Sequence, residues 1–357
     1  MSFPKAGAWA RENLFSSVGN SLLSLAAIWL IAWAVWATID WALLSAVFTG
    51  RDGRACSGDG VGACWPFVTA KFGQFMVGRY PDAERWRVWL VYALAAGALG
   101  AAMMPALRAR GWLMLALAVG VPVAAFVLLV GGMFGLRYVP TELWGGLLVT
   151  LVVASAGIAA SLPLGTLLAL GRRSELPVVR WLSIGFIEIV RGVPLITVLF
   201  MASVMLPLVL PPGVSFDKLL RALIGVALFA SAYMAEVIRG GLQAIPRGQF
   251  QSADALGLTG AQKMMFVVLP QAYRIVIPGI VNSYISLFKD TSLVLIIGLF
   301  DLLGVVQQGI TADAKWFSPA TAVTGYVFAA FVFWVFCFAI SRAAAALEVR
   351  LAAGRGR

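Results

Sequence analysis

Histidine is absent from this sequence of 357 residues, and cysteine occurs only three times. Without histidine, the chain lacks Ser-His-Asp and Cys-His catalytic arrangements and every histidine-ligated metal site. Charged residues are also scarce, because they make up 12% of the chain against about 25% in soluble domains. The sequence contains no G-x-x-x-x-G-K-S/T loop to cradle phosphates, so any ATP that the function requires is bound by another chain.

Apolar residues take the place of the missing charges. They account for 61% of the chain, and the mean hydropathy is +0.91. A hydrocarbon core about 30 Å thick requires about 20 apolar residues in a helix, and only helices or closed barrels satisfy the backbone there. The long apolar runs predict an all-α polytopic membrane protein with eight spanning helices, near Val18–Phe48, Val88–Leu107, Trp112–Phe134, Trp144–Leu170, Ile184–Leu210, Leu219–Val237, Ile275–Leu299 and Ala320–Ala344.

The basic residues set the expected orientation. Lys and Arg number 27 against 16 Asp and Glu, which gives a net charge of +11. Cationic short loops stay on the cytoplasmic side, and their distribution favours both termini in the cytoplasm. The external segment at about 49–87 departs from this pattern, although long loops are weak topology signals. Nucleic-acid binding is disfavoured because the charges are divided among loops and tails instead of lying on one face.

Two of the cysteines lie in that external segment. Cys56 and Cys64 flank the glycine-rich stretch CSGDGVGAC, where a disulfide is geometrically easy and suits an oxidising compartment. Two reduced thiols are the alternative. The third cysteine, Cys337, lies within the last predicted span.

The apolar runs change in character near residue 139. Residues 1–138 are bulky and aromatic, which predicts an accessory layer of helices with an external loop at about 49–87. Residues 139–346 contain small residues, prolines and isolated polar groups, as expected where helices pack closely or surround a wet path. A basic tail follows at 347–357. Function is therefore expected in the second part.

Two sets of polar residues fall near the ends of predicted spans in this second part. Glu188 and Arg191 are three residues apart and precede Gly-Val-Pro, so opposite charges share a helix face beside a turn that the proline weakens. Tyr233 and Glu236 share a second helical face. Both sets are candidates for a translocation path. The alternative is a structural ion pair in each case, formed by Glu188 and Arg191 in the first set and by Glu236 and Arg239 in the second.

A third set follows Pro278. Asn282, Ser286 and Lys289 recur at the spacing of one helix face, and Asp290 comes next. Polar groups in lipid either satisfy one another across a helix interface or face water. This stripe is therefore predicted to line a passage, or otherwise to join helices or subunits.

The segment at about 240–270 is too long for a minimal connection between two spans. It reads as a short helix, a break at Gly257 and a second amphipathic stretch before Leu269-Pro270. We expect this cytoplasmic helix–turn–helix to expose Phe250, Leu256 and Leu258 and to enter a groove on another protein.

The same segment resembles the coupling motif of ABC importer permeases, E-A-A-x3-G-x9-I-x-L-P. The matching positions are Gln251, Ser252, Ala253, Gly257, Val267, Leu269 and Pro270, with Asp254 and Leu258 inside the motif. Gln251 and Ser252 depart from the motif, and Asp254 is a candidate to compensate for the missing acidic residue. Further stretches between about Leu143 and Leu303 are similar to the polar amino acid permease family: WGGLLVTL, EIVRGVPLITVLF, AYMAEVIRGGLQAIPRGQ and LPQAYRIVIPGIVNSYISLFKDTSL. The additional N-terminal spans and the segment CW…GRYPDAERWRV at Cys64–Val88 look like the general L-amino acid subgroup, as its M-type permease subunit, with the paired Q-type subunit as the alternative.

The resemblance implies a type I ABC importer permease core at residues 139–346. It implies a bacterial inner-membrane complex in which a homologous permease completes the path and a periplasmic binding protein delivers the amino acid. Two ATP-binding subunits would dock at the coupling loops and hold ATP and Mg, so this chain would carry no cofactor and no ATPase site. Transport would proceed by alternating access.

Two rivals remain from the residues alone. An ion-coupled secondary carrier would use Glu236 or Asp290 for protons or sodium and would work without other subunits. A membrane-embedded enzyme ranks last, because the sequence offers no histidine, no metal-ligand spacing and no nucleophile paired with a base.

Overall fold

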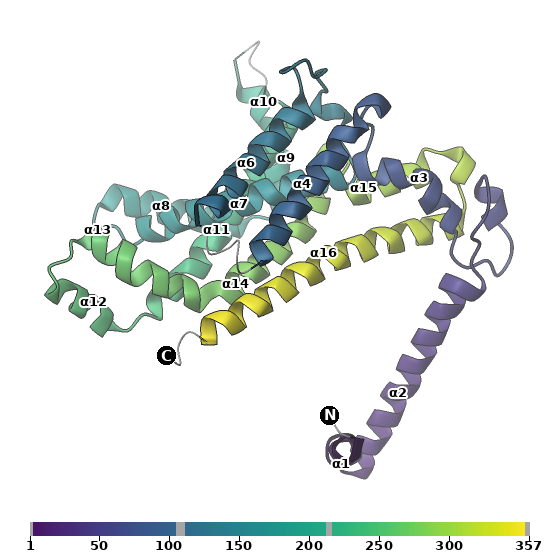
Figure 1. The fold of residues 1–357 in the computed structure, drawn as a ribbon, viewed down its shortest axis with the longest axis horizontal. Helices are drawn as coiled ribbons and strands as arrows, with labels where there is room; N and C mark the ends of the chain where they lie inside the picture. The colour runs from purple at the N-terminus through teal and green to yellow at the C-terminus, as the bar shows by residue number, and fades with distance from the viewer. Residues whose placement is uncertain (1–2, 105–110, 212–215, 354–357) are drawn as a thin grey trace. The chain divides into compact units, whose positions relative to one another are not determined.

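A computed structural model describes residues 3–104, 111–211 and 216–353 as helices joined by loops (Figure 1). Contacts divide the chain into two units, Met1–Lys71 with Gly309–Phe328 and Phe72–Gln308 with Ala329–Arg357. Part of the expected topology lies outside the described residues, namely the end of the span predicted at Val88–Leu107 and four arginines expected in the cytoplasm, Arg108, Arg110, Arg355 and Arg357.

The first unit begins with two helices, α1 (Phe3–Asn13) and α2 (Val18–Ile39). The Ser17 side chain caps α2 by accepting the Asn20 N–H, which satisfies one of the free donors of the first turn. A π-helical turn, η1 (Asp40–Leu44), continues the helix. The apolar stretch Val18–Leu44 buries none of its most hydrophobic window within the chain, as expected for a helix whose solvent is lipid.

The rest of the first unit is a cross-linked loop region. It contains η2 (Gly53–Cys56), the start of α3 (Trp65–Val77), η8 (Ala314–Trp316) and the start of α16 (Pro319–Ala353). Cys56 and Cys64 form a disulfide, and the Cys64 N–H donates to Thr324 Oγ1 at 2.7 Å. Lys71 pairs with Asp313 at 2.6 Å, and this ammonium holds the pKa of the Asp313 carboxyl below its usual range.

The second unit starts with an accessory pair of helices, α4 (Arg85–Met103) and α6 (Gly111–Val130), preceded by η3 (Asp82–Glu84). Arg87 is 1% exposed and pairs with Glu84 at 2.6 Å, while it donates to the Arg137 carbonyl at 2.8 Å. The Tyr80 hydroxyl donates to the Leu129 carbonyl at 2.8 Å, and burial raises the pKa of this phenol. These contacts fix the loops at one end of the pair.

The core of the second unit is built on α7 (Leu147–Gly171), α11 (Lys218–Gln243) and α14 (Leu269–Asp290). Glycine permits the close approach of α7 to its neighbours. A Cβ on Gly165 would lie 2.7 Å from the Met234 Cβ, and a Cβ on Gly157 would lie 2.9 Å from Leu287. Small residues at such contacts let membrane helices pack backbone to backbone.

One predicted span is bent instead of continuous. In place of a single helix over Ile184–Leu210, α8 (Pro177–Gly192) meets the stretch Leu195–Val209 at 106°. That stretch comprises α9 (Leu195–Phe200), η5 (Met201–Met205) and α10 (Leu206–Val209). The break falls at Val193, which is extended because the following Pro194 disfavours the helical conformation and supplies no N–H donor.

The remaining helices agree in general position with the expected spans. Among the described residues, six helices are long and apolar enough to cross a membrane, or seven if the bent pair is one span. The span expected at Val88–Leu107 is not among these helices; it corresponds to α4, whose first turn carries Arg85 and Arg87. After α14 come η7 (Thr291–Ile297) and a shorter apolar helix, α15 (Leu302–Thr311).

Candidate coupling segment and translocation pocket

The predicted helix–turn–helix lies between α11 and α14 (Figure 1). Its first helix, α12 (Arg247–Ala255), ends before Gly257, which has a φ of 74°. Glycine adopts this left-handed conformation without steric cost, so it ends the helix sharply. The second arm starts at α13 (Gly260–Gln262), where Thr259 and Gln262 form a capping box. We call the ends of α7 and α11 next to this segment, at Gly171 and Gln243, the coupling end.

The outward face of α12 carries most of the motif. Gln251, Ser252 and Asp254 are exposed, and Asp254 pairs with Lys263 at 2.6 Å, which ties the two arms together. Leu256, at the end of the helix, is 78% exposed. This face is therefore polar with one large apolar side chain, a composition that suits contact with another protein.

The inward face of α12 anchors it to the rest of the unit. Ala253 is 1% exposed, and Phe250 packs against the buried cluster that contains Ile238. The Arg173 guanidinium lies 6.0 Å from the centre of the Phe250 ring. The expectation that Phe250 and Leu258 are exposed was wrong, because both are partly buried; spacing alone does not tell which apolar side chain meets a tertiary partner.

The second arm runs into α14 without a break at Leu269-Pro270. Between them lies a π-helical stretch, η6 (Lys263–Val268), and Pro270, which supplies no N–H donor, follows as the second residue of α14. The continuous apolar helix therefore covers Gly260–Ile297 and starts well before the predicted Ile275. The last two motif positions belong to a spanning helix instead of a linker.

Five charged side chains form a network at the coupling end. The Glu236 carboxylate accepts from Arg172 and Arg239 at 2.9 Å each and lies 3.6 Å from Arg191, and Arg172 also reaches Glu188 at 2.9 Å. The network joins the end of α7 to α8 and α11. Charge-assisted bonds of this kind are stronger than neutral ones, and loss of the shared carboxylate leaves three cations to repel one another.

The predicted pair within α8 does not form. Glu188 and Arg191 do share a face, but Glu188 contacts Arg172 and Arg191 contacts Glu236. Sequence reasoning missed Arg172 as a site residue, although the Arg172-Arg173 pair directly follows an apolar run. Tertiary partners outcompete the i,i+3 pair here because α7 and α11 bring opposite charges closer.

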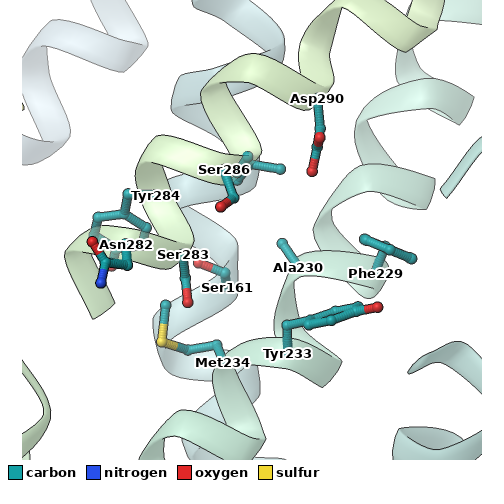
Figure 2. A pocket seen from close by; sticks show the side chains of 11 residues that line it. Ser161, Phe229, Ala230, Tyr233, Met234, Asn282, Ser283, Tyr284, Ser286 and Asp290 are labelled. Atoms are coloured by element: carbon teal, nitrogen blue, oxygen red, sulfur yellow. The ribbon is translucent and has the colours of Figure 1, made fainter. Parts of the chain in front are cut away.

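A cavity of about 340 Å³ lies between α7, α11 and α14 (Figure 2). Figure 2 shows Asp290 and Ser286 on α14 across open space from Tyr233 on α11. The lining residues are Ser161, Phe229, Ala230, Tyr233, Met234, Asn282, Ser283, Tyr284, Ser286, Leu287 and Asp290. The structure thus brings together the predicted residues Tyr233, Asn282, Ser286 and Asp290. The Arg191 guanidinium lies 5.6 Å from the Tyr233 ring, which links this pocket to the charged network.

Lys289 does not line the pocket, contrary to the stripe predicted from spacing. Each residue turns a helix by about 100°, so Ser283, Ser286 and Asp290 cluster on one side of α14 and Lys289 falls beyond its edge. Ser161 from α7 and Phe229 from α11 were not foreseen as lining residues. Each lies in an apolar run that gives no local signal of which face meets a cavity.

Comparison with known proteins identifies the family. Residues 161–353 match the family described as binding-protein-dependent transport system inner membrane component. The matched part holds the coupling segment, the charged network and the pocket. The chain belongs to this family. Membership favours transport driven by ATP through partner subunits over the ion-coupled carrier.

Two relatives of this permease match it over nearly its whole length. The inner membrane amino-acid ABC transporter permease protein YhdY of Escherichia coli is 51% identical over 98% of this chain and 94% of its own. The glutamate/glutamine/aspartate/asparagine transport system permease protein BztC of Rhodobacter capsulatus is 39% identical over 96% of this chain and 93% of its own. Several apolar helices and these relatives support a multi-pass inner membrane protein.

A solved structure matches a smaller part of the permease. The crystal structure of an amino acid ABC transporter with histidines has a TM-score of 0.50 and 28% identity, over 57% of this chain and 92% of that chain. The solved chain therefore corresponds to little more than half of this one. The family match, which starts at residue 161, likewise leaves the accessory helices outside.

Proposed function

We propose that this chain is the membrane-embedded permease subunit of an ATP-driven amino acid importer. One observation carries the proposal: a capped helix–turn–helix joins α11 to α14 in a chain of this transport family and turns Leu256 outward. The names of the two full-length relatives support amino acids as the substrate class.

In this proposal, ATP and Mg are bound by partner subunits. These subunits contact α12 through Gln251, Ser252 and Leu256. Two routes lead from there to the pocket. The second arm is part of the continuous helix Gly260–Ile297, which also carries Asp290, so a tilt of the coupling segment displaces the pocket wall. Packed elements of this kind switch between discrete arrangements instead of deforming smoothly.

The second route runs through side-chain contacts. Phe250 on α12 lies against Arg173, whose neighbour Arg172 binds Glu236. Glu236 also holds Arg191, which lies over Tyr233 in the pocket wall. A movement of α12 therefore reaches the network and the pocket without any free loop between them.

The pocket offers groups that suit a zwitterion or its hydration water. Asp290 supplies a carboxylate for an ammonium group, and Asn282 and Ser286 supply donors and acceptors. We infer that a homologous permease chain completes the path and that a periplasmic binding protein delivers the substrate. Both termini then lie in the cytoplasm, and this chain, as the M-type subunit, hydrolyses no ATP itself and needs no cofactor of its own.

The first prediction tests the turn of the coupling segment. Gly257→Val places a β-branched side chain at a φ of 74°, which costs roughly 1 kcal/mol or more and distorts the turn. We expect uptake of amino acids by the assembled complex to fall at least about tenfold, with less ATP-binding subunit co-purifying and unchanged membrane insertion.

Gly240→Val is the matched control, since Gly240 has an ordinary φ and an added Cβ would have no heavy atom of the described residues within 4 Å. It should keep uptake near the wild-type rate. Normal uptake and normal co-purification of the ATP-binding subunit by Gly257→Val would contradict the proposed coupling role.

A further inference from the structure

A second cavity, of about 240 Å³, lies at the ends of α7 and α11 opposite the coupling end. We call it the distal pocket. Its lining residues are Arg79, Thr141, Glu142, Trp144, Lys218, Gly298, Leu299 and Phe300, all in the second unit. They come from the loop after α3, from η4 (Thr141–Leu143) and its end, from the start of α11 and from the turn after η7.

Two cations in this pocket have no acidic partner among the residues that the structure describes. Arg79 donates to the Glu142 carbonyl at 3.4 Å, and its guanidinium lies 5.9 Å from the centre of the Phe300 ring. Lys218 begins α11, and its ammonium lies next to Gly298. Glu142 is the acidic residue of the lining, yet it forms no ion pair with either cation, so the lining carries one net positive charge.

The third feature is a donor without an acceptor. Trp144 is 7% exposed, and its indole Nε1 has no hydrogen-bond partner within residues 3–104, 111–211 and 216–353. A buried donor left unpaired is costly, and this one belongs to a residue that lines the distal pocket. The buried Nε atoms of Arg87 and Arg221 are also unpaired, but other nitrogens of those guanidinium groups donate to carbonyls, whereas the indole has a single donor.

We propose that the distal pocket binds the carboxylate of a free amino acid on its way to the membrane part of the chain. Guanidinium and ammonium groups are both donors, and they form the strongest type of hydrogen bond with carboxylate oxygens. The volume fits one small organic acid and not a folded segment of another protein. The inference rests on the proposed function for the identity of the acid.

The distal pocket also assigns a role to the N-terminal part of the chain. Arg79 precedes residue 161, where the family match starts, whereas Lys218 and Gly298 lie within the match. The accessory segment therefore adds a cation to a surface of the permease core. Gly78 permits this approach, because a Cβ there would lie 2.4 Å from the Gly145 Cα.

The test measures binding to the full-length chain in lipid nanodiscs, with L-glutamine and L-glutaminamide as probes. The amide has the same side chain but no carboxylate, so we expect it to bind at least about tenfold more weakly. Arg79→Gln and Lys218→Gln should each weaken L-glutamine binding about tenfold. Lys218→Arg keeps the charge and should stay within about threefold of wild type. Lys315→Gln, which removes a cation of the other unit, should leave this binding unchanged.

Equal binding of L-glutamine by wild type, Arg79→Gln and Lys218→Gln overturns the inference. Equal affinity of the wild type for L-glutamine and L-glutaminamide also overturns it. A variant that loses affinity for the periplasmic binding protein while it keeps L-glutamine binding also overturns it, because the pocket is then a docking point. Uptake by the assembled complex is measured separately. No ATP-dependent uptake by wild type refutes the proposed function, whereas normal uptake without carboxylate-dependent binding refutes the distal pocket alone.

Discussion

The two ends of the α7 and α11 pair differ in whether their basic side chains have acidic partners. At the coupling end, the Glu236 carboxylate forms ion pairs with Arg172, Arg191 and Arg239. At the opposite end, Arg79 and Lys218 have no acidic partner in the part of the chain that the structure describes. A cation that is already paired holds elements of the protein together, whereas an unpaired one in a pocket is free to hold something else. The first arrangement suits a mechanical joint and the second a ligand site.

The largest effect is expected when Glu236, the carboxylate shared by three arginines at the coupling end, is removed. Glu236→Ala leaves three guanidinium groups close together, and Glu236 keeps only 15% of its side chain exposed. Removal of one partner from such a network costs about 3 kcal/mol. We therefore expect a lower thermal unfolding temperature of the chain in nanodiscs and loss of ATP-dependent uptake.

Two variants sharpen this comparison. Glu188→Ala removes a carboxylate that is 54% exposed and contacts one arginine, so its cost should be below about 1 kcal/mol. Glu236→Gln keeps an acceptor for the arginines and should be milder than alanine. If Glu236→Ala unfolds at the wild-type temperature and still supports uptake, the network is not a joint.

A smaller effect is expected in the pH dependence of stability, where the buried Asp301 is compared with the ion-paired Asp313. Burial raises the pKa of Asp301 to about 6, although the carboxylate accepts hydrogen bonds from the Gly304 and Leu303 N–H groups, which lower the pKa. Between about pH 4 and 6 the folded chain then holds a proton that the unfolded chain has lost, so stability falls as pH rises through this window. Asp301→Asn should remove this slope, which amounts to roughly 2 kcal/mol, when unfolding is followed in denaturant.

Asp313 provides the opposite slope in the same experiment. The Lys71 ammonium lowers the pKa of Asp313, so its contribution is present above the unfolded pKa and is lost as pH falls through the folded one. Because the Asp313 side chain is 30% exposed, this contribution should be below about 1 kcal/mol. An Asp301→Asn variant with the same stability slope as wild type between pH 4 and 6 would contradict the burial account.

The sequence predicts what depends on local pattern. The apolar runs predict most of the spans, and Gly257 predicts the break in the coupling segment, because a left-handed glycine needs no distant partner. The disulfide between Cys56 and Cys64 closes a short glycine-rich turn and was one of two readings. The domain boundary at residue 139 and the roles of the site residues stay predictions.

What the sequence missed depends on tertiary neighbours. The charge on Glu188 pairs across to α7 instead of along its own helix, and Lys289 falls off the pocket face of α14. Phe250 is covered because Arg173 lies against its ring. In each case the helical spacing allowed the predicted contact, but the position of a second helix decided the outcome.

The central claim is that an ATP-binding partner subunit moves the coupling segment. The most direct measurement is amino acid uptake into liposomes that contain this chain and its permease partner, with and without the ATP-binding subunit. The account predicts no uptake until both that subunit and ATP are present, and loss of uptake again when Leu256 is replaced by Asp. Uptake by the permease chains alone, driven by a proton or sodium gradient, would contradict it.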